Sequence, residues 1–117
     1  MSEKNKQRKW VREEVVILVT EYFKTKHFSN EVIEENYQRV SDFLRKREEK
    51  ITGAPVPEIF RNYAGIRMQS SRIRCLDPDT KYSGMEGTAL QKEIVQEYLS
   101  NPQKLLDEAI EVYKKYE

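Results

Sequence analysis

Apolar residues recur every three or four positions along most of this chain, and this spacing limits the possible folds more than any other feature of the sequence. Residues three or four apart share one side of an α-helix, so each repeat gives a helix an apolar face. Segments rich in Pro, Gly or Asn separate the repeats. The sequence therefore predicts an all-α fold, a compact bundle of about five helices. The predicted helices cover about residues 10–24, 30–48, 62–75, 89–99 and 102–116.

The first predicted helix contains an unbroken apolar run, VVILV at residues 15–19, that is also compatible with a buried strand. A helix is favoured for two reasons. Glu13 and Glu14 fall in its first turn, where acidic side chains stabilise the positive end of the helix dipole. The apolar stripe also extends further along the chain than a strand needs.

The ends of the helices are marked by residues that suit helix termini. Ser29 and Asn62 are good N-caps because their side-chain oxygens accept hydrogen bonds from free N–H groups. Asn101 and Pro102 place a cap and a first-turn proline before the last helix. Pro78 disfavours helical geometry at Asp77 and stops the third helix.

The length of 117 residues corresponds to one domain. Residues 1–9 are polar, basic and without periodicity, so we expect a flexible basic arm followed by a single helical domain at residues 10–117. The formal net charge is only +1, from 21 basic and 20 acidic residues. Any binding to nucleic acid must then come from a local patch rather than from the field of the whole protein.

Catalytic and metal-binding motifs are not found in the sequence. A single histidine, His27, and a single cysteine, Cys75, supply neither a zinc ligand set nor an internal disulfide. No phosphate-binding loop or dinucleotide fingerprint occurs. We therefore expect no enzymatic activity, no cofactor and no metal. The polar N-terminus and the short apolar runs predict a cytoplasmic protein that does not enter a membrane.

The third predicted helix combines an apolar side with an Arg-bearing side. At 100° per residue, Tyr63, Ile66, Ser70 and Ile73 share the inner face. Arg67 and Arg74 share one edge of the outer face, and Arg72 lies on the opposite edge. The outer face comprises Ala64, Arg67, Met68, Ser71, Arg74 and Cys75. Slender side chains between flanking guanidinium groups suit a helix in a DNA groove, and they also suit an ordinary solvated helix.

Six short segments carry a resemblance that covers nearly the whole chain after residue 9. They are WVREE at 10–14, FRN at 60–62, Ile66, LDP at 76–78, GMEGT at 84–88 and EIV at 93–95. In this pattern the chain resembles the N-terminal helical accessory domain of bacterial HNH-type restriction endonucleases. The resemblance implies a DNA-binding accessory domain without the catalytic domain, because HNH chemistry requires a cluster of His, Asp or Asn ligands.

The chain departs from that family pattern at four positions of the third helix. Gln69, Ser70, Arg72 and Ile73 stand where Lys, Leu, Asn and Phe are usual. These changes leave open which DNA sequence the helix would prefer. Ser70 on the inner face predicts either an underpacked spot or a hydroxyl bonded back to a carbonyl one turn earlier.

Two functions are compatible with these features. In the first, a helix-turn-helix-like core binds duplex DNA through the helix at residues 62–75. In the second, the chain is a small protein-binding module, such as a phage- or mobile-element-type inhibitor of a defence nuclease. The Arg-edged helix and the resemblance favour DNA, whereas the near-zero net charge favours a protein partner. The predicted DNA-binding residues are Lys46, Arg61, Asn62, Arg67, Ser71, Arg72 and Arg74.

Overall fold

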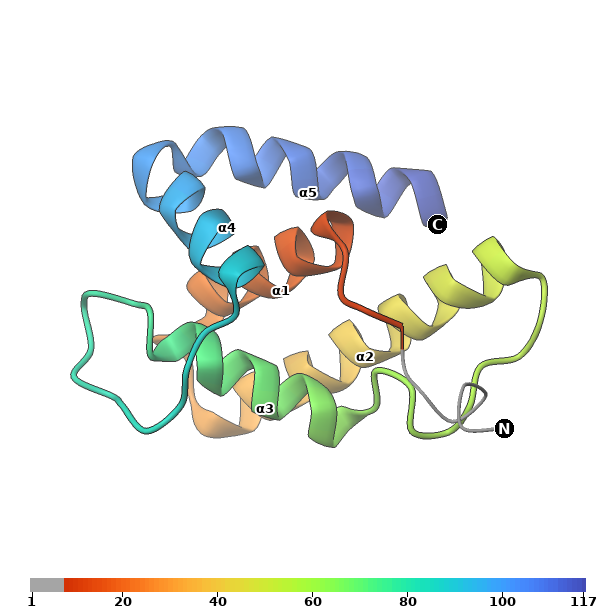
Figure 1. Ribbon diagram of the computed structural model, residues 1–117, viewed down its shortest axis with the longest axis horizontal. Coiled ribbons are helices and arrows are strands. Elements are labelled where there is room, and N and C mark those ends of the chain that lie inside the picture. Colours follow the sequence, from red (N-terminus) through yellow and green to blue (C-terminus); the bar gives the residue numbers. More distant parts are fainter. Residues whose placement is uncertain (1–7) are drawn as a thin grey trace.

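The computed structural model describes residues 8–117, and within them the chain forms five α-helices and no strand. The predicted all-α bundle is therefore confirmed (Figure 1). Of the predicted arm, residues 1–7 lie outside the described residues. The helices are α1 (Arg12–Thr25), α2 (Asn30–Thr52), α3 (Tyr63–Arg74), α4 (Ala89–Ser100) and α5 (Pro102–Tyr116).

Helix α1 is the centre of the bundle. It lies between α5 and α4 on one side and α2 and α3 on the other (Figure 1). Each residue of the run Val15–Val19 is at most 1% exposed. A helix that is apolar all round is stable only when it is enclosed, which explains the run. The alternative of a buried strand is wrong.

The predicted helix starts are confirmed by their caps. The Asn62 side chain accepts a hydrogen bond from Gly65 N at 2.8 Å, and Ser29 accepts from Val32 N. The end of α2 lies four residues beyond the predicted end, at Thr52. Gly53 there adopts a φ of 71°, which glycine tolerates, and its N–H donates to the Glu49 carbonyl.

The helix-turn-helix-like core is not confirmed. A helix-turn-helix motif joins its two helices by a turn of about three or four residues. Among the first three helices, the short connection lies between α1 and α2, at residues 26–29. Residues 53–62 separate α2 from α3, although these helices and α1 all pack against one another. Helix α3 therefore packs against α1 and α2, but a long segment, residues 53–62, precedes it instead of a short turn.

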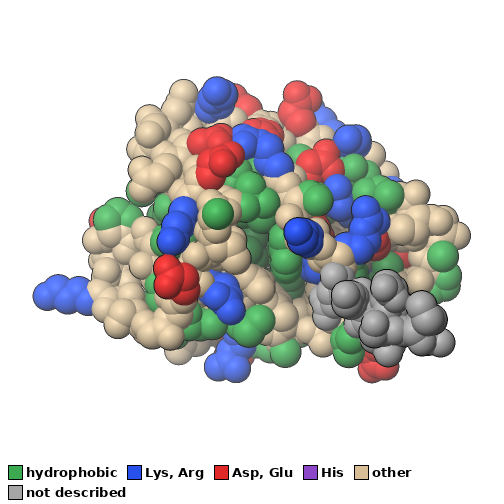
Figure 2. Space-filling view, viewed as in Figure 1, with side chains coloured by type: hydrophobic (Ala, Val, Ile, Leu, Met, Phe, Trp, Pro, Cys, Tyr) green, Lys and Arg blue, Asp and Glu red, His purple; other side chains and the backbone are tan. Residues whose placement is uncertain are grey.

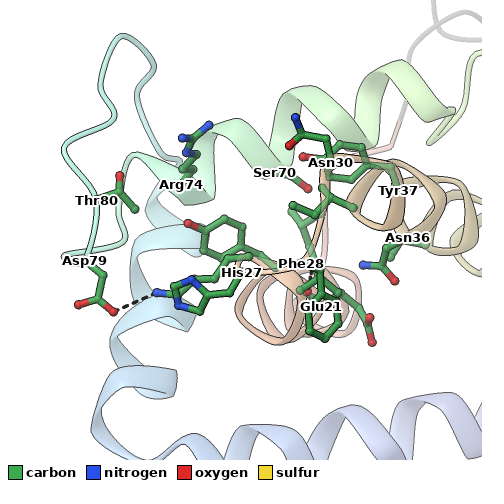
Figure 3. Close-up of a pocket in the computed structure, with 16 residues that line it drawn as sticks. Glu21, His27, Phe28, Asn30, Asn36, Tyr37, Ser70, Arg74, Asp79 and Thr80 are labelled. Carbon is green, nitrogen blue, oxygen red and sulfur yellow. Dashed lines mark hydrogen bonds and ion pairs between the residues drawn. The ribbon is translucent and has the colours of Figure 1, made fainter.

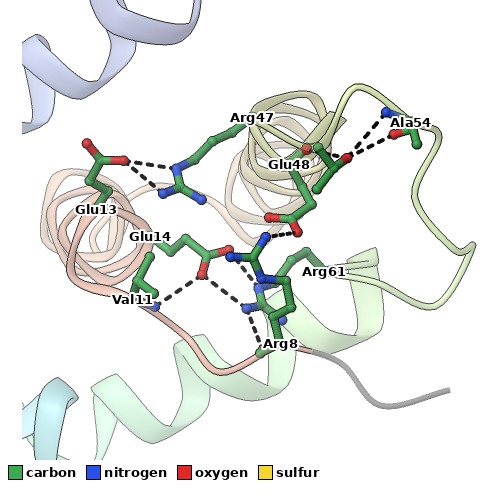
Figure 4. A network of polar contacts seen from close by, with 9 residues as sticks. Arg8, Val11, Glu13, Glu14, Arg47, Glu48, Ala54 and Arg61 are labelled. Atoms are coloured by element: carbon green, nitrogen blue, oxygen red, sulfur yellow. Dashed lines mark hydrogen bonds and ion pairs between the residues drawn. The ribbon is translucent and has the colours of Figure 1, made fainter. Parts of the chain in front are cut away.

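The segment before α3 is fixed by a buried ion pair between Arg61 and Glu14 (Figure 4). Arg61 Nε lies 2.8 Å from Glu14 Oε2, and Nη2 lies 3.0 Å from Oε1. Both residues are 2% exposed. The guanidinium also lies 4.2 Å from the Trp10 ring centroid and 4.4 Å from that of Phe60. This two-point contact joins the start of α1 directly to the start of α3.

The backbone around this ion pair is drawn into the same network. Arg61 Nη2 donates to the Arg8 carbonyl, and the Ser41 hydroxyl of α2 donates to the Arg61 carbonyl at 2.7 Å. Arg61 has a φ of +45°, a left-handed conformation that is uncommon for a residue with a side chain. The surrounding contacts hold it there, so one residue fixes the positions of α1, α2 and α3 together.

A second polar cluster joins α1 to the C-terminal helices. Arg12 donates to Glu97 of α4 at 2.6 Å and to Glu108 of α5 at 2.8 Å. Hydrogen bonds from Arg12 hold the pKa of Glu97 below its usual value. On the other side of α1, Arg47 of α2 donates to Glu13 at 2.8 Å. Arg12 and Glu13 therefore link α1 to α2, α4 and α5, and Glu14 links it through Arg61 to the segment that leads into α3.

We expect Arg61→Met to lower the free energy of unfolding by about 3–5 kcal/mol, because it leaves the Glu14 carboxylate buried without its cation. Urea denaturation measures this change. The matched control is Arg67→Met on the exposed face of α3, which should change stability by less than about 0.5 kcal/mol. Equal effects of the two substitutions would show that the ion pair does not hold this segment.

Candidate nucleic-acid interface

The outer face of α3 carries two exposed arginines, Arg67 and Arg74, on the same side of the helix. The inner face is as predicted, since Ile66, Ser70 and Ile73 are buried. No acidic residue occurs in α3, and Met68 beside Arg67 is 44% exposed. The face is thus locally basic, with an exposed apolar side chain at its edge.

The two guanidinium groups differ in their surroundings. The Arg67 side chain makes no hydrogen bond or ion pair with any residue of 8–117. Arg74 lies over the ring of Tyr82, with its guanidinium carbon 4.2 Å from the ring centroid. A cation stacked on an aromatic face keeps its in-plane N–H groups free for a second ligand. Both arginines can therefore donate to an anion from this side.

Arg72, on the opposite edge, is already occupied by the protein. Its Nη1 donates to the Glu86 carbonyl at 2.5 Å, and its Nε is buried without a hydrogen-bond partner among the described residues. Glu86 lies in the segment between α3 and α4 and also pairs with Lys92. Arg72 thus holds this segment against α3 and contributes less to an outer surface than predicted.

The segment after α3 is anchored by the buried carboxylate of Asp77. It accepts hydrogen bonds from the Tyr22 hydroxyl of the last turn of α1 at 2.7 Å and from Nζ of Lys26, the residue after α1, at 2.9 Å. The Asp79 N–H donates to its other oxygen at 2.9 Å. Burial alone raises the pKa of Asp77, but these hydrogen bonds outweigh it and keep the pKa below its usual value. The same anchor keeps Tyr82 beside Arg74.

Two of the predicted DNA-binding residues need correction. Arg61 cannot reach a phosphate because its guanidinium is enclosed with Glu14. Lys46 is exposed, but it lies on the other side of α2, beside Tyr113 and Tyr116 of α5. Both residues belong to basic clusters that precede α3 in the sequence. In the fold, however, the Arg61 side chain is buried and Lys46 lies on the side of α2 that faces α5.

The remaining predicted residues have local roles. Asn62 uses its side chain to cap α3, and the Ser71 hydroxyl donates to the Arg67 carbonyl at 3.2 Å. Of the seven predicted residues, the structure brings Arg67, Ser71 and Arg74 together on one outer face. Tyr82, which lies under the Arg74 guanidinium, was not among the predicted DNA-binding residues, because no local pattern links a tyrosine in a loop to an arginine eight positions earlier.

The surface charge on the face seen in Figure 1 is mixed. Figure 2 shows basic and acidic side chains interspersed on the face seen in Figure 1, with apolar side chains between them. No continuous basic surface is visible in this view. An anionic partner would thus meet a few defined contacts rather than a broad positive field.

Within residues 8–117 no group of three or more His, Cys, Asp or Glu side chains could hold a metal ion. The same residues contain no helix with the length and apolar character needed to cross a bilayer. Comparisons with protein-family models, with curated proteins and with solved structures find no match. The resemblance to the HNH accessory domain therefore stays a prediction.

We expect the Asp77 anchor to make the stability of the protein depend on acid pH. Because the folded pKa of Asp77 is lowered, its contribution is present above the unfolded value of about 3.9 and is lost as the pH falls through the folded value. Asp77→Asn should cost about 1.5–3 kcal/mol at neutral pH and less near pH 3. Urea denaturation at both pH values measures the difference.

The control for this prediction is Asp107→Asn, an exposed carboxylate of α5. Its effect should be small at both pH values. A loss of stability in Asp77→Asn that is the same at pH 3 and pH 7 would mean that the Asp77 charge does not contribute to the anchor.

Proposed function

We propose that this chain is a non-catalytic, cytoplasmic module that binds duplex DNA through the outer face of α3. The observation that carries the proposal is the pair Arg67 and Arg74, which are exposed on one side of a helix that contains no acidic residue. The lack of enzymatic activity rests on the residue inventory, with one histidine and one cysteine. The resemblance to the accessory domain of HNH restriction endonucleases supports the same function.

The spacing of the two arginines suits a DNA backbone. They are seven residues apart, which corresponds to two helical turns and about 10 Å along the helix axis. Phosphates of one strand are spaced by about 3.4 Å along the DNA axis, so this distance covers roughly three of them. Ser71 lies between the arginines and is small enough for the helix to approach base edges.

A protein partner is the second candidate, and one observation favours it. Met68 and Tyr82 are 44% and 38% exposed beside the two arginines. Arg, Met and Tyr are the side chains enriched at protein interfaces. An acidic partner, such as a defence nuclease that this chain inhibits, would then cover the same face. DNA is favoured because this alternative leaves the family resemblance unexplained.

We expect a duplex-DNA titration to show weak, salt-dependent binding. With Arg61 buried and Arg72 occupied, two phosphate contacts remain, each contributing roughly 0.9 to the slope of log affinity against log salt. The slope should be near −2. The double substitution Arg67→Gln with Arg74→Gln should reduce the slope to near zero, because it removes both contacts and keeps side chains of similar length.

The matched control is Lys104→Gln with Lys114→Gln, two exposed lysines of α5. This control carries the same change in net charge, so it separates a local contact from a general electrostatic effect. Wild-type protein that does not bind duplex DNA at low salt would exclude the proposal. Equal losses in the two double variants would exclude α3 as the contact surface.

A further inference from the structure

A cavity of about 320 Å³ lies on the inner side of α3, between the end of α1 and the first turns of α2 (Figure 3). Its volume lies at the lower end of the range of small-molecule sites. Aromatic rings from three elements line it. They are Tyr22 of α1, Phe28 of the turn between α1 and α2, and Tyr37 of α2.

Two buried polar side chains in the lining have unused hydrogen-bonding groups. Ser70 is 5% exposed and points from α3 toward the cavity, and its hydroxyl makes no hydrogen bond with any residue of 8–117 (Figure 3). Asn36 is also 5% exposed. Its Oδ1 accepts from Arg39, whereas its Nδ2 has no partner among residues 8–117. Neither atom is itself fully enclosed, so both groups open onto the cavity, where a ligand can supply their hydrogen-bond partners.

The Ser70 hydroxyl therefore does not bond back to a carbonyl of its own helix. Of the two outcomes expected from the sequence, the underpacked spot is the one that occurs. Where relatives of the proposed family carry Leu, the smaller Ser leaves space and adds a hydroxyl.

Apart from Arg74, an exposed side chain that also lies over Tyr82, the charged side chains of the lining are paired within the protein. Lys26 contacts Asp77 at 2.9 Å and Asp79 at 3.0 Å. Glu21 contacts Lys24 at 3.0 Å and accepts from the Tyr113 hydroxyl. Among the buried lining groups the unpaired ones are thus neutral. They suit an uncharged ligand, because a buried charge without a counter-charge is unfavourable.

We infer that this cavity binds a nucleobase. A base is planar and uncharged, so it can stack on the Tyr37 or Phe28 ring. Its edge carries acceptors and donors that the Asn36 amide and the Ser70 hydroxyl complement. Two sources supply this chemistry, a free nucleoside and a base of a strand held at α3. The second source rests on the proposed DNA binding, and the first does not.

The test is a titration of the protein into 2-aminopurine riboside, whose fluorescence is quenched when the base stacks on an aromatic ring. We expect saturable quenching that at least one unlabelled nucleoside reverses. Ribose, which has no base, should not reverse it. Quenching by the same base in a single-stranded oligonucleotide would assign the source to a strand, and quenching of the riboside alone would assign it to a free nucleoside.

Two variants of Ser70 separate the hydroxyl from the space. Ser70→Ala keeps the cavity and should weaken binding about two- to tenfold, the effect of one lost hydrogen bond. Ser70→Leu fills the cavity and should abolish binding. Ser100→Ala, at the exposed end of α4, is the matched control and should leave binding unchanged. Thermal melting establishes whether each variant is folded. If Ser70→Leu is unfolded, the comparison of Ser70→Ala with Ser100→Ala decides the test.

The inference is overturned if no saturable quenching occurs at millimolar riboside, or if Ser70→Ala binds as tightly as Ser100→Ala. Duplex binding is measured separately with the same samples. Duplex binding without nucleoside binding would overturn only the cavity inference. Nucleoside binding without duplex binding would overturn only the proposed function.

Discussion

The buried ion pair between Glu14 and Arg61 is the contact on which the arrangement of the first three helices depends. It joins the first turn of α1 to the residue immediately before the Asn62 cap, and the Arg61 carbonyl accepts from Ser41 of α2. A buried charge pair is stabilising only when its geometry is good and its other groups are satisfied. Two direct contacts and two flanking aromatic rings meet that condition here. The direction in which α3 leaves this point is fixed as a result.

The position of α3 determines which arginines can act on a partner. Arg61 is enclosed and Arg72 holds the segment between α3 and α4, so only Arg67 and Arg74 face outward without an acidic neighbour on their own helix. Asp77 anchors the following segment to α1 and places Tyr82 against Arg74. The outer face of α3 is therefore a product of tertiary contacts on both sides of the helix. The inner edge of the same helix borders the cavity that contains Ser70.

Structural features that depend only on residues close together in the sequence could be predicted from it. Asn62 caps α3 through Gly65, three positions away, and the buried face of α3 follows from the helical period. The role of Arg61 could not be predicted, because its partner Glu14 lies 47 positions earlier and Arg61 looks no different from Arg67 in the sequence. The placement of Lys46 could not be predicted for the same reason, since it depends on which side of α2 faces α3 and which side faces α5. The end of α2 at Thr52 was missed because the cap at Gly53 needs a backbone angle that the sequence only suggests.

The division between the buried Arg61 and the two outward-facing arginines Arg67 and Arg74 is the central claim, and arginine Nε resonances test it directly. Duplex DNA is titrated into ¹⁵N-labelled protein at low salt, and the Arg Nε–H signals are followed by NMR. The account predicts that the signals of Arg67 and Arg74 shift with DNA concentration. The Arg61 signal should stay in place and remain protected from exchange with solvent, because its guanidinium is buried against Glu14. A shift of the Arg61 signal without shifts at Arg67 and Arg74 would contradict the account.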